Sequence, residues 1–216
     1  PVCKKIIKSG NKYASSRKNS YPRKMREINA SQITKTVRDL CIESNINLPS
    51  DIKARINYYL DKEPWAGAKG ILEKIVENYE IAEKTCVPIC QDSGAACVFV
   101  EVGQDVHING NLTDAINEGV RQGYTEGYLR KSMVSDPLER INTKDNTPAM
   151  ITYDIVPGSK LKITLAPKGF GSENMSRIGM LKPSDGVEGV KDFVLNTIKE
   201  AGPNPCPPMV VGVGIG

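Results

Sequence analysis

The sequence has a single histidine, His107, and no stretch that approaches 18 consecutive apolar residues. One imidazole excludes a histidine-rich metal site and argues against a histidine-based catalytic triad. We expect His107, in the turn-like sequence His-Ile-Asn-Gly, to be a surface residue. The missing apolar run argues against a membrane-spanning helix, and no apolar segment of a secretory signal follows the basic start. We therefore expect a cytoplasmic protein.

Acidic residues are missing from the first 24 positions, which hold eight lysines and arginines. The other 21 basic residues lie from Met25 onward, where all 25 acidic residues give this part a net charge of −4. A basic arm on an acidic domain can bind nucleic acid or an anionic surface. The arm has no periodic pattern, however, so we do not favour a nucleic-acid partner. We interpret residues 1–24 as a disordered or non-native extension, with a transit peptide as the alternative, and residues 25–216 as the domain.

Hydrophobic periodicity indicates a helical start and a strand-rich middle. Prolines and glycines separate the elements, and Pro157-Gly158-Ser159 reads as the turn of a hairpin between two strands. The sequence thus predicts an α+β fold: an N-terminal helical bundle, then a mixed or antiparallel sheet flanked by helices, truncated at the C-terminus within the apolar run Val210–Gly216. The expected elements are helices over residues 29–45, from Ser50, after Pro64, over 113–128 and from Asp185, and strands over 95–102, 150–156 and 161–166.

Six cysteines in a chain without a secretion signal indicate reduced thiols, some of which can be metal ligands. Cys41 falls on a helix face and Cys97 within a strand, so we expect both in the core. Cys86 stays ambiguous, because its spacing to Cys90 matches neither ferredoxin nor zinc motifs.

Cys90 lies in a loop ahead of a predicted buried strand and is followed by Gln91, Asp92, Ser93 and Gly94. A soft thiolate beside amide, carboxylate and hydroxyl groups favours an iron–sulfur cluster, zinc or Cu(I) over hard cations. The alternative is a buried free cysteine beside a turn.

Cys206 is flanked by Pro203, Pro205, Pro207 and Pro208. Prolines fix the backbone, so little ordering entropy is lost when this thiol binds a metal. A stiff linker with an incidental cysteine is the alternative.

Two further segments are candidate anion sites. Arg130 is expected where a helix runs into a loop, and its guanidinium can hold a carboxylate through two hydrogen bonds. The alternative is a solvated cation near the helix end. Gly171 lies in Lys168–Asn174, where glycine N–H groups can form an anion nest, or the segment is a plain loop.

Taken in order, these motifs resemble the alpha region of the iron–sulfur (class I) fumarate hydratases, and L-tartrate dehydratase alpha subunits are similar. The resemblance runs from Met25 to Gly216. The motifs that carry it are Cys90-Gln-Asp-Ser-Gly, Arg130 in Arg-x-Ser-x-Val-x-Asp-Pro-Leu, Lys168-Gly-x-Gly-Ser-Glu-Asn, and Cys206-Pro-Pro-x-Val-Val-Gly-Val-Gly-Ile-Gly.

The resemblance implies a hydro-lyase that hydrates fumarate reversibly to L-malate, a step of the tricarboxylic acid cycle. A [4Fe–4S] cluster on three cysteines would act as a Lewis acid, and Cys90 and Cys206 map to two of its ligands. Asp92 and Arg130 map to catalytic positions. Gln91 and Gly171 map, with these two, to substrate contacts.

In the family, the third cysteine ligand and the catalytic base lie beyond the equivalent of Gly216, in a C-terminal region or beta subunit. We therefore expect that a C-terminal or beta subunit supplies the rest of the active site and that the protein is an oligomer. The isolated chain should have no activity. Tartrate is an open alternative to fumarate as the substrate. A non-catalytic module that uses its cysteines structurally is the alternative of another class.

Overall fold

The computed structural model describes residues 3–6, 25–206 and 209–216. The chain divides into a first unit that ends at Lys168 and a second unit, Gly169–Gly216. Most of the expected N-terminal extension lies outside the described residues. Its residues Cys3–Ile6 form strand β1.

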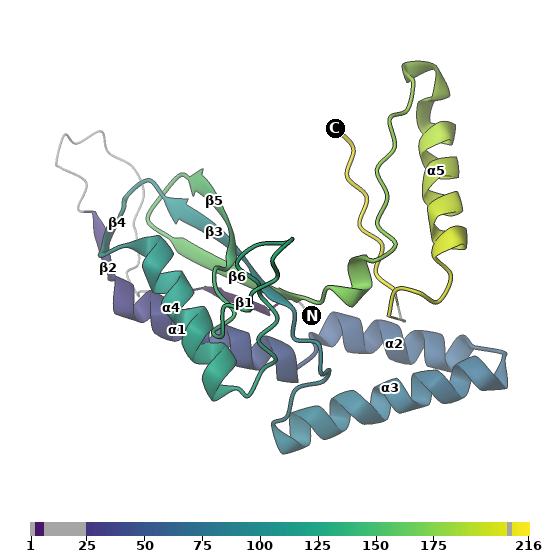
Figure 1. Ribbon diagram of the computed structural model, residues 1–216, viewed down its shortest axis with the longest axis horizontal. Helices are drawn as coiled ribbons and strands as arrows, with labels where there is room; N and C mark the ends of the chain where they lie inside the picture. Colours follow the sequence, from purple (N-terminus) through teal and green to yellow (C-terminus); the bar gives the residue numbers. More distant parts are fainter. Residues whose placement is uncertain (1–2, 7–24, 207–208) are drawn as a thin grey trace, which may run out of the picture. The chain divides into compact units, whose positions relative to one another are not determined.

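The first unit combines helices with a mixed sheet, and the predicted α+β class is confirmed (Figure 1). Asn29 ends β2 and caps α1, as its position before the apolar helical pattern predicts. After β1, the elements are β2 (Arg26–Asn29), α1 (Ala30–Ile46), α2 (Ser50–Lys62), α3 (Ala66–Thr85), β3 (Ala95–Gly103), β4 (Val106–Asn109), α4 (Leu112–Glu126), β5 (Met150–Val156) and β6 (Leu161–Lys168).

The main sheet has the strand order β1-β6-β3-β5. Strand β3 runs antiparallel to β6 and parallel to β5. Alternate residues of β3 point into the core, where α1 and α4 cover one face of the sheet (Figure 1). The core joins these elements through Val37, Leu40, Val98, Val100, Ile116, Val120, Tyr124, Ile163 and Leu165.

The predicted hairpin between residues 150–156 and 161–166 is wrong, because β3 lies between these strands. Their connection crosses the end of β3, where Gly103 N donates to Lys160 O at 2.8 Å. A Cβ on Gly103 would lie 2.3 Å from Gly158 O, so the crossing requires glycine there. Strands β5 and β6 pair with opposite sides of the apolar β3. In this central position β3 is more buried than it would be at the edge of a sheet.

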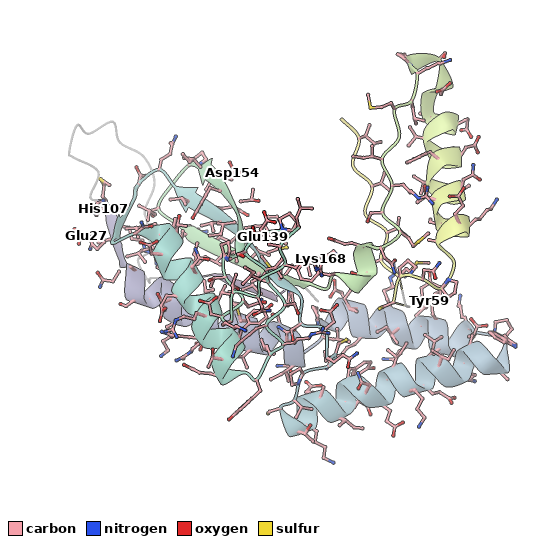
Figure 2. The ribbon with its side chains drawn as sticks, viewed as in Figure 1. Glu27, Tyr59, His107, Glu139, Asp154 and Lys168 are labelled. Carbon is pink, nitrogen blue, oxygen red and sulfur yellow. The ribbon has the colours of Figure 1, made fainter. Side chains whose placement is uncertain are left out.

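The turn predicted at His107 is also wrong in its position. Residues 106–109 form β4, which pairs in parallel with β2, and His107 lies opposite Glu27 (Figure 2). The strand forms because Ile28 is buried and Ile108 packs on the core. The chain turns only afterwards, at Gly110, where φ is +120°. His107 is exposed, as expected.

Two glycines of α4 let it approach α1 closely. A Cβ on Gly119 would lie 2.6 Å from Thr34 O, and one on Gly123 would lie 2.6 Å from Cys41 Cβ. Across the same contact, Thr34 Oγ1 donates to Ala115 O at 3.0 Å. Without side chains at these two positions, the helix backbones pack against each other directly.

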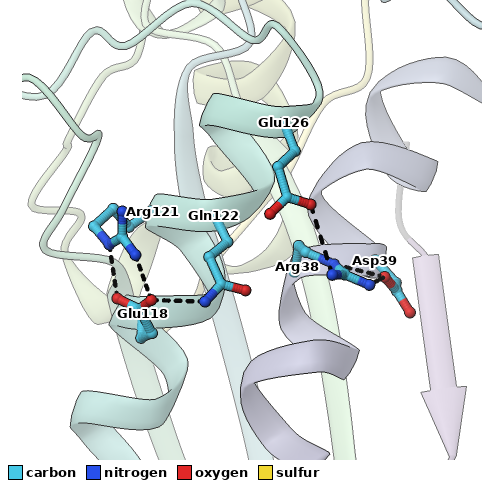
Figure 3. Close-up of polar contacts among 6 residues, drawn as sticks. All are labelled: Arg38, Asp39, Glu118, Arg121, Gln122 and Glu126. Atoms are coloured by element: carbon cyan, nitrogen blue, oxygen red, sulfur yellow. Dashed lines mark hydrogen bonds and ion pairs between the residues drawn. The ribbon is translucent and has the colours of Figure 1, made fainter. Parts of the chain in front are cut away.

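Charged groups border this helix pair (Figure 3). Arg38 of α1 lies 3.6 Å from the carboxylate of Glu126 on α4. Glu118 accepts hydrogen bonds from Arg121 and from Gln122, and the bond from Gln122 measures 2.6 Å. The bond from Arg121, followed by the bond from Gln122, lowers the pKa of Glu118 to about 2. The charged groups all remain partly open to solvent, so they add little to stability.

The second unit contains the single turns η1 (Gly171–Glu173) and η2 (Pro183–Asp185) and the helix α5 (Gly186–Ala201). The predicted final helix is confirmed, and it ends where Gly202 takes a φ of +50°. Arg177 pairs with Glu200 of α5 at 3.1 Å. Across the described residues, no helix has both the length and the apolar character that a membrane crossing requires.

We predict that Gly123→Ala destabilises the protein by about 2 kcal/mol, because the new methyl group overlaps Cys41 and the backbone of Arg38. Gly70→Ala in α3 is the matched control, since a Cβ there meets nothing within 4 Å. That change should stabilise by about 0.5–1 kcal/mol through helix propensity. Urea unfolding measures both, and equal effects at the two positions would contradict close packing at Gly123.

Candidate functional site

The loop that carries Cys90 is fixed to two helices just before the cysteine. Ile89 N donates to Asn45 O in the last turn of α1 at 2.8 Å. Asn78 Nδ2 of α3 donates to Ile89 O at 2.9 Å. Both backbone groups of Ile89 are therefore satisfied, and the chain enters the Cys90 loop from a fixed point.

A second fixed point, Ser93, follows four residues after Ile89. Ser93 is only 2% exposed, and its carbonyl accepts a hydrogen bond from the Tyr124 hydroxyl of α4 at 3.0 Å. Gly94 N donates to Asp92 Oδ1 at 3.1 Å, and Gly94 takes a left-handed φ of +58°. Cys90 and Gln91 lie between these anchors and are exposed, while Asp92 is half-buried.

The Cys90 thiol is free and exposed, so the alternative of a buried structural cysteine is wrong. The backbone N–H of Asp92 donates to Cys90 Sγ at 3.4 Å. An N–H group directed at sulfur stabilises a thiolate, and such hydrogen bonds tune iron–sulfur clusters. An exposed thiol with this donor, on an anchored loop, has the chemistry of a cluster ligand.

The structure brings Arg130 to the same loop. As predicted, Arg130 lies just beyond α4, and its side chain is exposed. Its backbone N–H donates to Ser93 Oγ at 3.1 Å. Two residues further on, Ser132 N and Met133 N donate to Asn146 Oδ1, and Asn146 Nδ2 donates to Gly94 O at 3.0 Å.

Asp136, within the Arg130 motif, has a local role. Its carboxylate accepts hydrogen bonds from the N–H groups of Leu138 at 2.8 Å and Glu139 at 2.9 Å. These backbone hydrogen bonds lower the pKa of Asp136. The Asp-Pro-Leu sequence therefore shapes the turn after Arg130.

Sequence reasoning missed Tyr124 and Asn146, the two buried groups that hold this site together. Burial raises the pKa of the Tyr124 hydroxyl well above its ordinary value, so it stays a neutral donor to Ser93 O. Helical spacing puts Tyr124 in the core, but it gives no sign of the hydroxyl's partner. Asn146 lies in a polar segment without periodicity. Nearby, Ser132 Oγ is buried and makes no hydrogen bond within the described residues.

Gly171 and Cys206 belong to the second unit, where the structure links their segments. Gly171 begins the η1 turn within the predicted loop. Asn174, directly after that turn, donates through Nδ2 to Asn204 O at 3.0 Å, two residues before Cys206. The Cys206 thiol is free and exposed, and Pro207 and Pro208 lie outside the described residues.

The other cysteines divide by burial. Cys41 is fully buried in the core, as predicted, and burial raises its pKa. Cys97 is only partly buried and lies outside the core cluster, so its predicted place in the core is wrong. Cys86 is exposed at the end of α3 with a left-handed φ of 56°. In the described part of the chain, no group of three or more histidine, cysteine or acidic side chains is arranged to hold a metal ion.

A sequence model of the fumarate hydratase (Fumerase) family matches residues 34–216, which include Cys90, Arg130 and Cys206. The chain belongs to this family. The resemblance that the motifs predict, from Cys90 to Cys206, is thereby confirmed.

Curated relatives support the assignment. The chain is 43% identical over 192 residues to the "Putative L(+)-tartrate dehydratase subunit alpha" of Methanocaldococcus jannaschii, across 86% of this chain and 67% of that protein. It is 31% identical over 188 residues to the L(+)-tartrate dehydratase subunit alpha of Escherichia coli strain UTI89, and 30% identical to that of strain K12. These matches cover 85% of this chain and 62% of each E. coli protein.

We predict that Tyr124→Phe lowers the free energy of unfolding by about 1 kcal/mol at pH 8, because Ser93 O loses its donor. The folded-state pKa of Tyr124 is raised, so its contribution is complete below pH 10, the ordinary value, and is lost above it. The wild type should therefore lose about 1.4 kcal/mol per pH unit above that point, relative to the variant. Urea unfolding at pH 8 and pH 11 tests this, and an unchanged difference between the two proteins would contradict a buried phenol.

Proposed function

We propose that this chain is the cluster-binding part of an iron–sulfur hydro-lyase that interconverts fumarate and L-malate. The observation that carries the proposal is the attachment of the Arg130 segment to the Cys90 loop through Ser93 and Asn146. This contact supports the proposal, because a dicarboxylate hydro-lyase requires an anion-binding group and a metal-binding thiol on neighbouring segments. Membership of the fumarate hydratase family and relatives named as alpha subunits support it.

Cys90 and Cys206 are the proposed ligands of a [4Fe–4S] cluster. When bound, the cluster supplies a Lewis-acidic iron that stabilises the departing hydroxyl. Both thiols are exposed and free, and Cys90 already receives an N–H donor at 3.4 Å, so the donors suit the group. The third ligand and the base that removes the carbon-bound proton are proposed to come from a C-terminal region or beta subunit.

Arg130 is proposed to bind one carboxylate of the substrate through two parallel N–H bonds. Its backbone N–H is bound to Ser93 Oγ, which fixes the backbone of Arg130 relative to the Cys90 loop. Gln91 is exposed and can donate to a second oxygen, and Gly171 is proposed to contribute a backbone N–H. Gly94 N donates to one carboxylate oxygen of Asp92, and the carboxylate is proposed to bind a substrate hydroxyl.

L-tartrate dehydration is the second candidate activity, because the relatives at 43% and 31% identity carry that name. Tartrate differs from malate by one added hydroxyl. A site that hydrogen-bonds this hydroxyl would discriminate strongly between the two substrates.

The deciding experiment assembles the chain anaerobically with its C-terminal or beta partner, iron and sulfide, and assays fumarate, L-malate and L-tartrate separately. The proposal predicts visible thiolate–iron absorption and fumarate–malate turnover that is lost in air. Turnover of tartrate alone would transfer the assignment to the second candidate. Iron-free protein without turnover on any of the three would support a non-catalytic module instead.

We predict that Arg130→Lys raises the KM for the dicarboxylate by about tenfold or more, because an ammonium group cannot bind a carboxylate through two parallel bonds. Lys131→Gln, which removes the neighbouring charge, is the control and should change the KM less than about twofold. Steady-state kinetics of the assembled enzyme measure both. Equal effects of the two substitutions on the KM would mean that Arg130 contributes only to the positive charge of the surface.

A further inference from the structure

We propose that Asn146 is a positioning residue, which sets the register of the Arg130 segment against the Cys90 loop. The inference rests on the proposed function in one respect: this register would place a bound carboxylate relative to the Cys90 thiolate. Asn146 touches neither thiol nor guanidinium through any of its hydrogen bonds; it acts through the backbone of both segments.

The Asn146 side chain is fully buried, and all of its hydrogen bonds go to the site segments. Oδ1 accepts from Ser132 N at 2.7 Å and from Met133 N at 3.1 Å. Nδ2 donates to Gly94 O at 3.0 Å. Asparagine alone combines, at this size, an oxygen for two N–H donors with a nitrogen for a carbonyl.

The backbone of Asn146 supports this role. Its φ of 64° lies in the left-handed region, which asparagine tolerates better than most side chains do. The segment that carries it is attached to α4, because Ala149 N donates to Asn117 Oδ1 at 2.8 Å. Asn142 Nδ2 also donates to Lys131 O at 2.8 Å. The first of these bonds holds the segment of Asn146 on α4, and the second joins it to the Arg130 segment.

The Asn146 amide and the Ser93 hydroxyl form two links between the same pair of segments. Arg130 N donates to Ser93 Oγ at 3.1 Å, and one residue further along the Cys90 loop, Asn146 binds Gly94 O. Two links restrict both sliding and rotation, whereas a single link would leave rotation free. Loss of the amide would thus change the position of Arg130 without removing any group that touches substrate.

Amide hydrogen exchange in the full 216-residue chain tests the inference through two variants. Asn146→Asp keeps the acceptor for Ser132 and Met133 but removes the donor to Gly94 O. It should leave the Ser132 and Met133 amides protected and speed exchange by about tenfold at the Arg130 amide, which donates to Ser93 Oγ across the two segments. Asn146→Gly removes both functions and should speed exchange by about tenfold at all three amides.

Val120→Ala, a core substitution on α4 away from both segments, is the control for lost stability. If Asn146 has only a general structural role, both Asn146 variants will follow this control, with exchange rising uniformly as stability falls. That result would overturn the inference. If Asn146→Gly does not fold, the difference in exchange between the Arg130 and Ser132 amides in Asn146→Asp decides alone.

In the assembled enzyme, Asn146→Asp should raise the KM for the dicarboxylate by about tenfold more than Val120→Ala does, with a smaller effect on kcat. An unchanged KM in an active enzyme would contradict the positioning role. The exchange measurements need neither cluster nor substrate. A protein with the split exchange pattern but no hydratase turnover would therefore disprove the proposed function and leave the register set by Asn146 established.

Discussion

The close approach of α4 to α1 is the packing constraint on which the rest of the first unit depends. Gly119 and Gly123 leave no room for a side chain between the helices, so α4 lies deep against the core. Tyr124, the next residue, is then fully buried, and its hydroxyl reaches Ser93 O. A wider helix separation would withdraw this donor from the Cys90 loop and move Arg130, which lies just beyond the end of α4.

Each of the two units carries one proposed cluster ligand, Cys90 or Cys206, and one candidate anion-binding segment. In the first unit, Ser93 and Asn146 join the Arg130 segment to the Cys90 loop. In the second, Asn174 joins the Gly171 turn to the Cys206 segment. A candidate metal ligand and a candidate anion-binding segment are thus joined by hydrogen bonds once in each unit, which agrees with the proposed cluster and carboxylate substrate.

Local patterns in the sequence predict much of this structure. The helices and the three longer strands follow from periodicity and from their caps, and the exposed cysteines and Arg130 follow from motif chemistry. Strand pairing does not follow, because the sequences of β5 and β6 and the turn between them fit a hairpin. In the structure, β3 lies between the two strands. Tyr124 and Asn146 escape prediction for a related reason. Tyr124 binds Ser93, 31 residues away in the chain, and Asn146 binds Gly94, 52 residues away. No local pattern in the sequence indicates such contacts.

The central claim is that Cys90, displayed between two anchored points, is a cluster ligand. Cysteine alkylation mapped by mass spectrometry, before and after anaerobic loading of the assembled protein with iron and sulfide, tests it most directly. The account predicts that loading protects Cys90 and Cys206, while Cys86, exposed four residues earlier, stays reactive. Protection of Cys86 with continued alkylation of Cys90 would contradict it.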